Sequence, residues 1–394
     1  MNNKRLIRIT TVPISLDKLL DGQLRFMSRF YDLTAMSSEK PYLEKVGEKE
    51  GVATFYLDLT RKITPLKDVG AVWKLYRFLK KNKTFIVHTH TPKAGIVGML
   101  AAKLAGVPHR LHTVAGLPLL ETTGTKRKIL DVVEKMTYWC ATRVYPNSYG
   151  LMEIIKQNKY CPAVKLKVLA NGSSNGIDTR RFSAGHFSAV QNTVLKKSLG
   201  IGEEDFVFIF VGRLVGDKGI NELVAAFDGL SRDNNKVKLL LVGPSENHLD
   251  PLKKVTEQII SANKNIIAAG YQSDVRPYFA ISDALAFPSY REGFPNVVMQ
   301  AGAMGLPSVV SNINGCNEII SDGENGLIIP VKDENALRNA MRRFIDERDF
   351  FGSLCANARA RILNLYEQNV VWEAILAEYR TFDAENPKHV QQNR

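Results

Sequence analysis

The sequence has few cysteines and no long apolar run. Its four cysteines among 394 residues are scattered and form no CxxC pair, which argues against a disulfide scaffold or a zinc site and fits a reducing cytoplasm. No apolar window reaches the roughly eighteen residues of a membrane-spanning helix. The N-terminal stretch "MNNKRLIRITTVPISL" has only a short, interrupted apolar part, which indicates a first strand rather than a signal peptide.

The length and the charge distribution indicate two domains of different character. A chain of 394 residues is longer than a single hydrophobic core usually accommodates, so its length favours two domains. Residues 1–180 carry 30 lysines and arginines against 14 aspartates and glutamates, a net charge of +16, whereas the remainder carries 23 against 26, a net charge of −3. The basic half is expected to face an anionic partner: nucleic acid, a lipid surface or a phosphate-bearing substrate.

Short apolar segments alternate with helical patterns along the whole chain. Strands are predicted in the first half at 5–12, 52–58, 84–88, 109–114 and 165–169, and helices at 66–82, 93–106 and 126–143. Strands are predicted in the second half at 206–212, 237–242, 265–269, 284–287, 307–311 and 326–329. Continuous apolar strands separated by helices are typical of parallel sheets covered on both faces.

The pattern therefore predicts an α/β protein of two doubly wound, Rossmann-like domains facing a cleft. The expected domains are 1–180 and 181–368, and the segment 369–394 is expected to contribute a helix that packs back on the first domain. The polar stretch 180–200 is the predicted hinge. Ligands of such sheets bind at the carboxyl ends of the strands, so strand-to-helix turns are where functional residues are sought.

The first such turn is "FVGRLVGDKGI". A strand is predicted to end at Gly212, and Arg213 and Lys218 flank a turn before a helix that begins near Gly219. Two cations beside a helix N-terminus are suited to binding a diphosphate. The alternative is a basic loop whose side chains are solvated.

The second turn is "PSYREGFPNVVMQAG", where a charged pair follows an apolar strand. Glu292 can accept hydrogen bonds from sugar-like hydroxyls, and Gln300 lies near the same face of the following helix, 296–304. The turn between them presents backbone N–H groups as an anion cradle, and its residues are Gly293, Phe294, Pro295 and Asn296. The alternative for Glu292 is a charge that complements the helix dipole, with Arg291 as its surface partner.

Two further turns in the first half contain histidines. His88 and His90 alternate along a strand, so their side chains point the same way, and Lys93 follows near a helix start. No third ligand is evident, so satisfied polar residues at a cleft edge are preferred to a metal site. His112 ends the next strand and is either a proton carrier or a buried, hydrogen-bonded side chain.

Several of these segments together resemble one enzyme family. "VGRLVGDKG", "PSYREGFPNVVMQAGAMGLPSV", "GCNEIISDGENGLIIP" and "NGIDTRRF" are similar to the retaining nucleotide-sugar glycosyltransferases of the GT-B fold, family four. The resemblance extends from the first strand to about residue 345. Within the family, "TVPISLDKLLDGQLRFM", "HTHTPKAG" and "HTVAGLPLLETTG" most resemble enzymes that extend lipid-linked sugars for capsule or O-antigen.

The resemblance implies roles for the residues of the second half. Arg213 and Lys218 would hold the donor diphosphate, and Glu292 would bind the donor sugar. The resemblance also implies a reaction with retention of configuration and without a metal or cofactor. Gln300 stands where the family has a second glutamate that grips the ribose, and Ala115 stands where many relatives have a histidine. Asp283 and Glu318 also match family positions and have possible structural roles.

The expected partners are a nucleotide-sugar donor, with uridine as the favoured base, and a lipid-linked sugar acceptor. The acceptor or cleft candidates are Ser15, Gly22, His88, His90, Lys93 and His112. The basic segment Thr125–Trp139 is the candidate for contact with an anionic membrane surface, which would place the enzyme peripherally at the cytoplasmic face. For Tyr138 and Trp139, packing on the sheet is the preferred interpretation.

Other functions are weighed against this one. A nucleic-acid-binding protein would explain the net charge of +13, but the sequence has no recognised binding motif and no basic run interleaved with stacking aromatics. A nucleotide-sugar epimerase is an alternative with the same fold. Release of nucleoside diphosphate only in the presence of an acceptor would distinguish a transferase from it. A pyridoxal-phosphate phosphorylase would need a cofactor lysine, for which the sequence offers no evident position.

Overall fold

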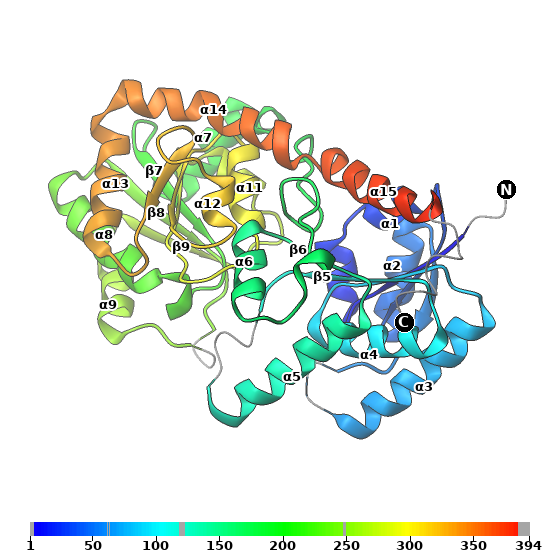
Figure 1. The fold of residues 1–394 in the computed structure, drawn as a ribbon. Coiled ribbons are helices and arrows are strands. Elements are labelled where there is room, and N and C mark those ends of the chain that lie inside the picture. The colour runs from blue at the N-terminus through cyan, green and yellow to red at the C-terminus, as the bar shows by residue number, and fades with distance from the viewer. Residues whose placement is uncertain (1–3, 61, 63, 118–122, 247–249, 385–394) are drawn as a thin grey trace. The chain divides into compact units, whose positions relative to one another are not determined.

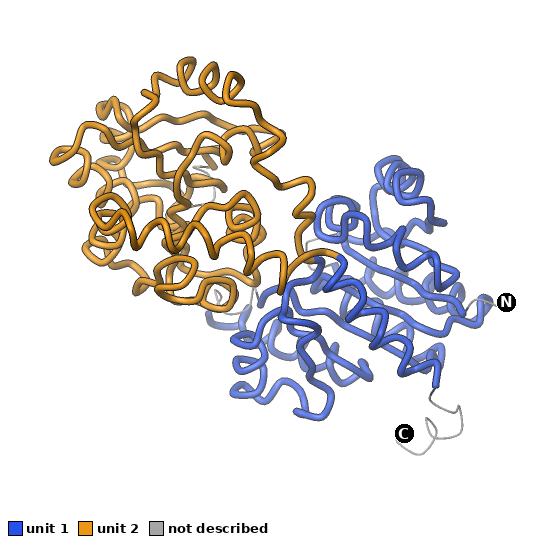
Figure 2. Tube along the Cα trace, turned by 90° about the horizontal axis from the view of Figure 1, so that it is seen from above, with its two compact units in different colours: residues 1–175, 369–394 blue, residues 176–368 orange. Residues whose placement is uncertain are grey.

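The computed structural model describes residues 4–384 except 61, 63, 118–122 and 247–249. The chain divides into two compact units, shown in different colours in Figure 2. Unit 1 contains residues 1–175 and 369–394, and unit 2 contains residues 176–368. The first boundary thus lies slightly before the expected residue 180, and the chain passes between the units twice.

Unit 1 is built on a six-stranded parallel sheet with the order β3-β2-β1-β4-β5-β6. The order reverses between β1 and β4, which makes their carboxyl ends the topological switch point of this sheet. Its strands are β1 (Arg5–Ile9), β2 (Asp32–Ser37), β3 (Ala53–Tyr56), β4 (Ile86–Thr89), β5 (His109–Val114) and β6 (Arg143–Pro146) (Figure 1).

Helices cover this sheet. They are a π-helical turn η1 (Ser15–Leu19), α1 (Gln23–Met27), α2 (Lys40–Glu50), α3 (Pro65–Lys81), α4 (Pro92–Ala105), α5 (Gly124–Cys140), α6 (Tyr149–Gln157), the 3-10 turn η3 (Ala163–Lys165) and α15 (Gln368–Ala384). Helix α4 packs against α3 on one side and α5 on the other, so these three form one layer. The predicted helices 66–82, 93–106 and 126–143 are confirmed with small shifts at their ends. In α5, the expectation that Tyr138 and Trp139 both pack inward holds for Tyr138 alone, since Trp139 is 62% exposed.

The strand prediction for the first half is wrong in one place and incomplete in two. The segment 165–169 forms no strand, because only Leu166 makes a bridge, to Val144. Strands β2 and β6 were not predicted. The sequence of β2, "DLTAMS", contains polar residues although most of the strand is buried, and β6 has four residues, the last of which is a proline. Neither has the continuous apolar run that identifies a buried strand.

The last helix, α15, belongs to the core of unit 1. Val371, Leu376 and Tyr379 are buried among residues of the first strands and helices. The ring of Phe382 stacks on His109 of β5, with 4.6 Å between the ring centres. The Tyr145 hydroxyl donates a hydrogen bond of 3.1 Å to the carboxylate of Glu378. The apolar core of unit 1 is thus completed by a segment from the far end of the chain.

Unit 2 has a second six-stranded parallel sheet with the order β12-β11-β10-β7-β8-β9. Its strands are β7 (Phe206–Val211), β8 (Val237–Val242), β9 (Ile266–Gly270), β10 (Ala284–Phe287), β11 (Ser308–Ser311) and β12 (Gly326–Ile329). Its helices are α7 (Ala189–Ser198), α8 (Ile220–Asp233), α9 (Lys254–Ala262), α10 (Arg276–Ala280), α11 (Asn296–Ala303), α12 (Cys316–Ile319), α13 (Glu334–Asp346) and α14 (Arg348–Tyr366), with 3-10 turns η4 (Ala184–His186) and η5 (Gly216–Lys218).

All six strands predicted for the second half are confirmed to within one residue at each end. They are identifiable because each is a short apolar run, and all but the edge strand β9 are mostly buried, as in "FVFIFV" of β7, where Phe208 and Phe210 are fully buried. The two sheets confirm the predicted fold class. The stretch 180–200, predicted as a hinge, contains the helix α7, which begins with a capping box formed by Ser188 and Gln191. No helix in the described ranges is long and apolar enough to cross a membrane.

Candidate functional site

Three loops of unit 2 meet at the carboxyl ends of its central strands. Strands β11, β10 and β7 are neighbours in the sheet, so the loops that follow them leave from adjacent points on one edge. Close approaches of the backbone hold these loops together. A Cβ atom on Gly219 would lie 2.1 Å from the carbonyl oxygen of Pro288, and one on Gly315 would lie 2.6 Å from that of Gly293. Both glycines also have positive φ angles, +72° and +77°, which other residues rarely adopt.

The loop after β7 contains the two predicted cations. Arg213 follows the strand and pairs with Glu246, with 3.1 Å between guanidinium and carboxylate. Lys218 ends the η5 turn and immediately precedes Gly219, the N-cap of α8. Gly212 has a φ of +155° and lies against Gly243, which follows β8; a Cβ atom on Gly243 would be 1.8 Å from the Gly212 carbonyl oxygen. The sequence therefore places two cations on a closely packed backbone beside a helix start.

The structure brings Lys218 and Glu292 together. The Lys218 ammonium contacts the Oε1 atom of Glu292, and each side chain is about five-sixths buried. Ser289 donates a hydrogen bond of 3.0 Å to the same carboxylate oxygen. Glu292 therefore has a specific cation partner from another loop, which goes beyond a charge that merely complements the dipole of α11.

A second ion pair joins the same two loops. Arg291 donates to the carboxylate of Asp217 at 2.6 Å, and the backbone N–H of Asp217 donates to Asp250 at 2.6 Å. Asn314, from the loop after β11, donates to the carbonyl oxygens of Glu292 and Gly293. Sequence reasoning missed Asp217 and Asn314. Both are polar residues in turns that follow a strand, and this position is the sequence signal that could have identified them.

The turn before α11 lies at the same edge. Gly293, Phe294, Pro295 and Asn296 lead into the helix, and Phe294 is buried beside the ring of Tyr366 at 5.4 Å between centroids. Gln300 lies in α11 and is partly exposed. The N-terminus of α11 therefore opens next to Glu292, so its free backbone N–H groups and its dipole favour an anion there.

Two further family-matched residues have structural contacts. Asp283 accepts a hydrogen bond of 2.7 Å from the backbone N–H of Val207, and burial raises the pKa of its carboxyl group. The backbone carbonyl of Glu318 accepts a hydrogen bond of 2.9 Å from the hydroxyl of Tyr366. Asp283 therefore links the start of β10 to β7, and Glu318 links α12 to α14.

In unit 1, a fully buried arginine lies beside two of the predicted histidines. Arg8 of β1 approaches His88 Nδ1 at 2.8 Å and His90 Nε2 at 2.7 Å. Because a guanidinium can only donate, both ring nitrogens accept. Burial lowers the pKa of both histidines, so they are neutral. The two rings stack at 4.2 Å, which confirms that they point the same way.

The remaining donors of this cluster are partly unsatisfied. The guanidinium of Arg8 also contacts Gln23, and His88 Nε2 donates to Thr113 at 2.7 Å. Among the described residues, the Nε atom of Arg8 and the Nδ1 atom of His90 have no hydrogen-bond partner, and no carboxylate pairs with Arg8. The cluster lies at the β1–β4 switch point, where such folds bind ligands.

His112 and Lys93 lie in different surroundings. His112 is buried, shares a hydrogen bond of 2.7 Å with Thr89, and has its pKa lowered to about 4 by burial. Gly95 of α4 makes room for its ring, because a Cβ atom there would be 2.6 Å away. Lys93 is paired with Asp68 of α3 at 2.5 Å. The structure thus places His112 as a neutral, packed side chain and Lys93 in a partly buried ion pair.

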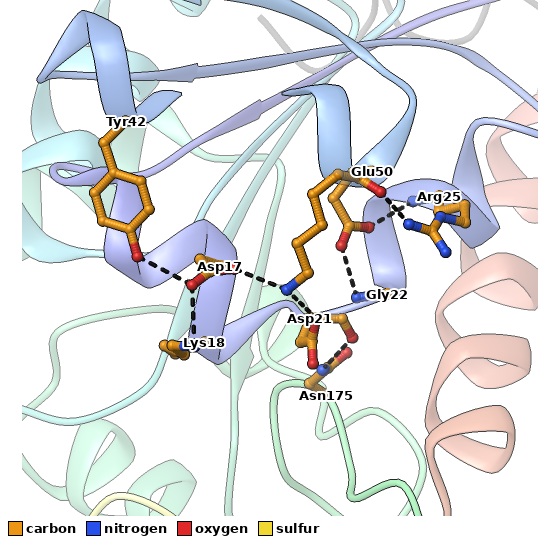
Figure 3. Close-up of polar contacts among 9 residues, drawn as sticks. Asp17, Lys18, Asp21, Gly22, Arg25, Tyr42, Glu50 and Asn175 are labelled. Carbon is orange, nitrogen blue, oxygen red and sulfur yellow. Dashed lines mark hydrogen bonds and ion pairs between the residues drawn. The ribbon is translucent and has the colours of Figure 1, made fainter. Parts of the chain in front are cut away.

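The segment that contains Ser15 and Gly22 is held by α2, as Figure 3 shows. Ser15 begins η1. Two residues later, Asp17 pairs with Lys49 at 2.7 Å and accepts a hydrogen bond from Tyr42 at 3.0 Å. Although burial opposes it, hydrogen bonds from Lys49, Lys18 and Tyr42 lower the pKa of Asp17.

The same helix end holds the start of α1. Glu50 is buried and accepts hydrogen bonds of 3.1 Å from the backbone N–H groups of Gly22 and Arg25 (Figure 3). These are N–H groups that the first turn of a helix leaves unpaired. The whole segment is thereby fixed against α2.

Asn175, the last residue of the first part of unit 1, joins three segments. Its side-chain oxygen accepts from Gln23 at 2.9 Å and from the indole N–H of Trp372 at 2.7 Å. Its amide nitrogen donates to the carbonyl of Asp21 at 3.0 Å. One buried amide thus connects α1, the preceding loop and α15 at the point where the chain leaves unit 1.

A metal centre has no evident ligand set in the part of the chain that the structure describes, where no group of three or more His, Cys, Asp or Glu side chains gathers. Residues 118–122 of the motif "HTVAGLPLLETTG" lie outside the described residues.

Comparison with known proteins identifies the family. The family model for glycosyl transferases group 1 matches residues 191–361, and the glycosyl transferase 4-like domain matches residues 26–172. The chain is 30% identical to a capsular polysaccharide biosynthesis glycosyltransferase of Staphylococcus aureus, CapM, over 97% of this chain and 98% of that protein. The chain belongs to this family of glycosyltransferases, as its motifs indicated.

Another relative has a more specific name. The chain is 31% identical to the UDP-Gal:alpha-D-GlcNAc-diphosphoundecaprenol alpha-1,3-galactosyltransferase of Escherichia coli, over 91% of this chain and 93% of that protein. Among solved structures, Anabaena HepE in complex with UDP and glucose covers 96% of this chain and all of its own, with a TM-score of 0.79 at 18% identity. A glycosyltransferase of Rickettsia africae superimposes with a TM-score of 0.81 at 17% identity. These structures share the fold of this chain, which confirms the GT-B assignment.

Proposed function

We propose that this glycosyltransferase moves a hexose or N-acetylhexosamine, with retention of configuration, from a UDP-sugar to an undecaprenyl-diphosphate-linked sugar in surface polysaccharide synthesis. One observation carries the proposal: a lysine and a glutamate from separate loops meet at the start of α11, at the carboxyl edge of the unit 2 sheet. The donor and acceptor classes are supported by the name of the Escherichia coli relative, and the role in surface polysaccharide synthesis by the name of the Staphylococcus aureus relative.

The residues suit a transfer in which negative charge builds on the departing diphosphate. Arg213 and Lys218 would stabilise that charge, and the N–H groups at the start of α11 would add to the same field. Glu292 would accept hydrogen bonds from the donor sugar, and Gln300 from the ribose. Lys218 would keep its contact with Glu292 and add one with phosphate, since one ammonium can donate up to three hydrogen bonds.

The bond changes can be assigned without a metal or a covalent intermediate. The acceptor hydroxyl oxygen forms the new bond to the anomeric carbon from the face that the diphosphate leaves, while the bond from that carbon to the diphosphate oxygen breaks. The hydroxyl proton passes to the departing phosphate oxygen. The protein contributes preorganised cations and N–H groups, and peripheral contact with the cytoplasmic face of a membrane would bring it to its acceptor.

The decisive experiment is a donor screen in the presence of EDTA. Purified protein receives UDP-GlcNAc, UDP-GalNAc, UDP-Gal, UDP-Glc or GDP-Man with a detergent-solubilised undecaprenyl-diphosphate sugar. We expect one UDP-sugar to release nucleoside diphosphate only when the acceptor is present, with one sugar mass added to the lipid. Acceptor-independent release would favour an epimerase, and no release from folded protein that binds no UDP would reject the proposal.

A further inference from the structure

The loops after β7 and β10 are joined by two ion pairs of opposite polarity. Asp217 and Lys218 are consecutive in the first loop, and Arg291 and Glu292 are consecutive in the second. Asp217 pairs with Arg291 at 2.6 Å, and Lys218 contacts Glu292. The other possible pairing, Asp217 with Glu292 and Lys218 with Arg291, would bring like charges together. The four charges therefore favour a single alignment of the two loops.

The backbone of Asp217 is fixed on both sides. Its N–H donates a hydrogen bond of 2.6 Å to the carboxylate of Asp250, and its carbonyl oxygen accepts one of 2.9 Å from the backbone N–H of Tyr290. Tyr290 immediately precedes Arg291, so main chain and side chain connect Asp217 to the same loop. The next residue, Lys218, thus begins from a backbone whose position is set by its neighbour.

The ion pair between Asp217 and Arg291 is only partly buried. The exposed fractions of the two side chains are 17% and 42%. In the part of the chain that the structure describes, the second carboxylate oxygen of Asp217, Oδ1, is buried and has no hydrogen-bond partner. An ion pair with an exposed cation usually contributes little to the free energy of unfolding. Stability alone is therefore a weak reason for a pair placed directly beside Lys218 and Glu292.

We infer that Asp217 and Arg291 are positioning residues of the donor site, whose ion pair holds the Lys218 ammonium where a phosphate group of the donor would bind. A lysine side chain is long and flexible, so its charge is precisely placed only when its backbone and its partner are both fixed. A displacement of about 1 Å of a catalytic group can cost about 10²-fold in rate. The inference rests on the proposed function, because it concerns how the cation for the diphosphate is kept in place.

The first test measures the position of Lys218 without any substrate. The protein is treated briefly with acetic anhydride, and mass spectrometry gives the acetylation rate of Lys218 relative to Lys254, an exposed lysine at the start of α9. The parent should react slowly at Lys218, which is paired and about five-sixths buried. Asp217→Asn and Arg291→Gln should each raise this relative rate severalfold. An unchanged rate in both variants would overturn the inference.

Two further variants show whether the effect is specific. Arg291→Lys keeps a cation opposite Asp217, so acetylation of Lys218 should stay near the parent rate. Arg342 of α13 pairs with Asp233 of α8 at 2.6 Å and is 44% exposed, so Arg342→Gln removes an arginine of similar exposure from another ion pair of unit 2. It should leave both acetylation of Lys218 and sugar transfer unchanged.

The second test asks whether the pair acts through Lys218. Asp217→Asn should lower kcat/KM by about 10–10²-fold in the parent, but by less than about threefold in a Lys218→Ala protein, because residues that act through one another are not additive. Losses that multiply would overturn the inference. So would a large loss in Arg291→Gln with none in Asp217→Asn, because Arg291 would then bind phosphate itself. Chemical unfolding verifies that each variant is folded.

The two tests separate this inference from the proposed function. If the variants raise acetylation of Lys218 but the parent neither transfers sugar nor binds UDP, the proposed function fails and the positioning of Lys218 stands. If the parent transfers sugar but acetylation of Lys218 is the same in the parent, Asp217→Asn and Arg291→Gln, the positioning role fails and the function stands.

Discussion

Lys218 and Glu292, 74 positions apart in the sequence, place their ammonium and carboxylate in contact between two loops of unit 2. The ion pair holds the cation at the sheet edge where a diphosphate would bind. Preorganised charge of this kind needs no rearrangement during reaction, which is why it is effective in catalysis.

Replacing Lys218 with alanine should reduce kcat/KM by about 10²–10³, the usual cost of losing one charge-stabilising donor. The measurement is the initial rate of nucleoside diphosphate release with saturating acceptor. Lys254→Ala, at an exposed lysine at the start of α9, is the matched control and should retain full activity. A Lys218→Ala protein of normal stability and normal rate would remove this residue from the mechanism.

Replacing Gly219 with alanine should damage both the site and the stability of unit 2. The new Cβ atom would meet the Pro288 carbonyl oxygen at 2.1 Å, and the φ of +72° is unfavourable for alanine. We expect the free energy of unfolding to fall by more than about 1 kcal/mol. Urea unfolding followed by circular dichroism measures it, with Gly352→Ala, whose Cβ atom would meet nothing within 4 Å, as the control.

Gln300 offers a test of the nucleotide contact. If its amide binds the ribose hydroxyls, Gln300→Ala should weaken UDP binding by about tenfold, because a net hydrogen bond contributes about 1 kcal/mol and an unpaired partner costs more. Gln300→Glu should keep the affinity, since a carboxylate accepts the same hydrogen bonds. Isothermal calorimetry with UDP decides the matter, and equal affinities for all three proteins would place the ribose elsewhere.

Glu134 should make stability depend on pH. Burial raises the pKa of its carboxyl group from 4.5 to about 7. Between these values the unfolded chain has lost the proton that the folded chain keeps, so the free energy of unfolding falls as the pH rises. The stabilisation is complete below pH 4.5 and lost above about 7, and a shift of this size corresponds to about 3 kcal/mol.

Comparing variants isolates this titration from the others. Glu134→Gln should be relatively more stable than the parent at pH 8 than at pH 5, whereas Glu153→Gln, at an exposed position paired with Lys156, should show no such difference. Chemical unfolding at several pH values measures both. A constant difference between Glu134→Gln and the parent would mean that the carboxyl group titrates normally.

Asn175 should contribute more to the stability of unit 1 than is usual for a loop residue. Asn175→Ala leaves the Gln23 amide and the Trp372 indole without their acceptor, and an unsatisfied buried donor costs about 1–3 kcal/mol. Asn175→Asp keeps an acceptor oxygen, and at a pH low enough to protonate its carboxyl group it adds no buried charge, so under those conditions it should be the milder change. Thermal unfolding at such a pH that shows the two variants to be alike would contradict this reading of the contacts.

The sequence predicted the fold better than it predicted the contacts. Apolar runs identify all six strands of unit 2, whereas the shared edge of the loops of Lys218 and Glu292 follows from the strand order, which was not predicted from the sequence. Strand β2 was missed because its burial is not accompanied by a continuous apolar run. The pairing of Arg291 with Asp217, and the bonds from Asn314, depend on loop conformations that residue type alone does not determine.

The docking of α15 on unit 1 has a consequence for how the chain is made. During synthesis, residues 176–368 emerge as one continuous stretch and can fold as soon as they leave the ribosome. Unit 1 starts earlier, but its core lacks Val371, Leu376 and Tyr379 until all of unit 2 has been synthesised. Of the two units, the one whose synthesis begins first is therefore the one whose folding is completed last, and its apolar surface stays exposed or chaperoned until α15 is made.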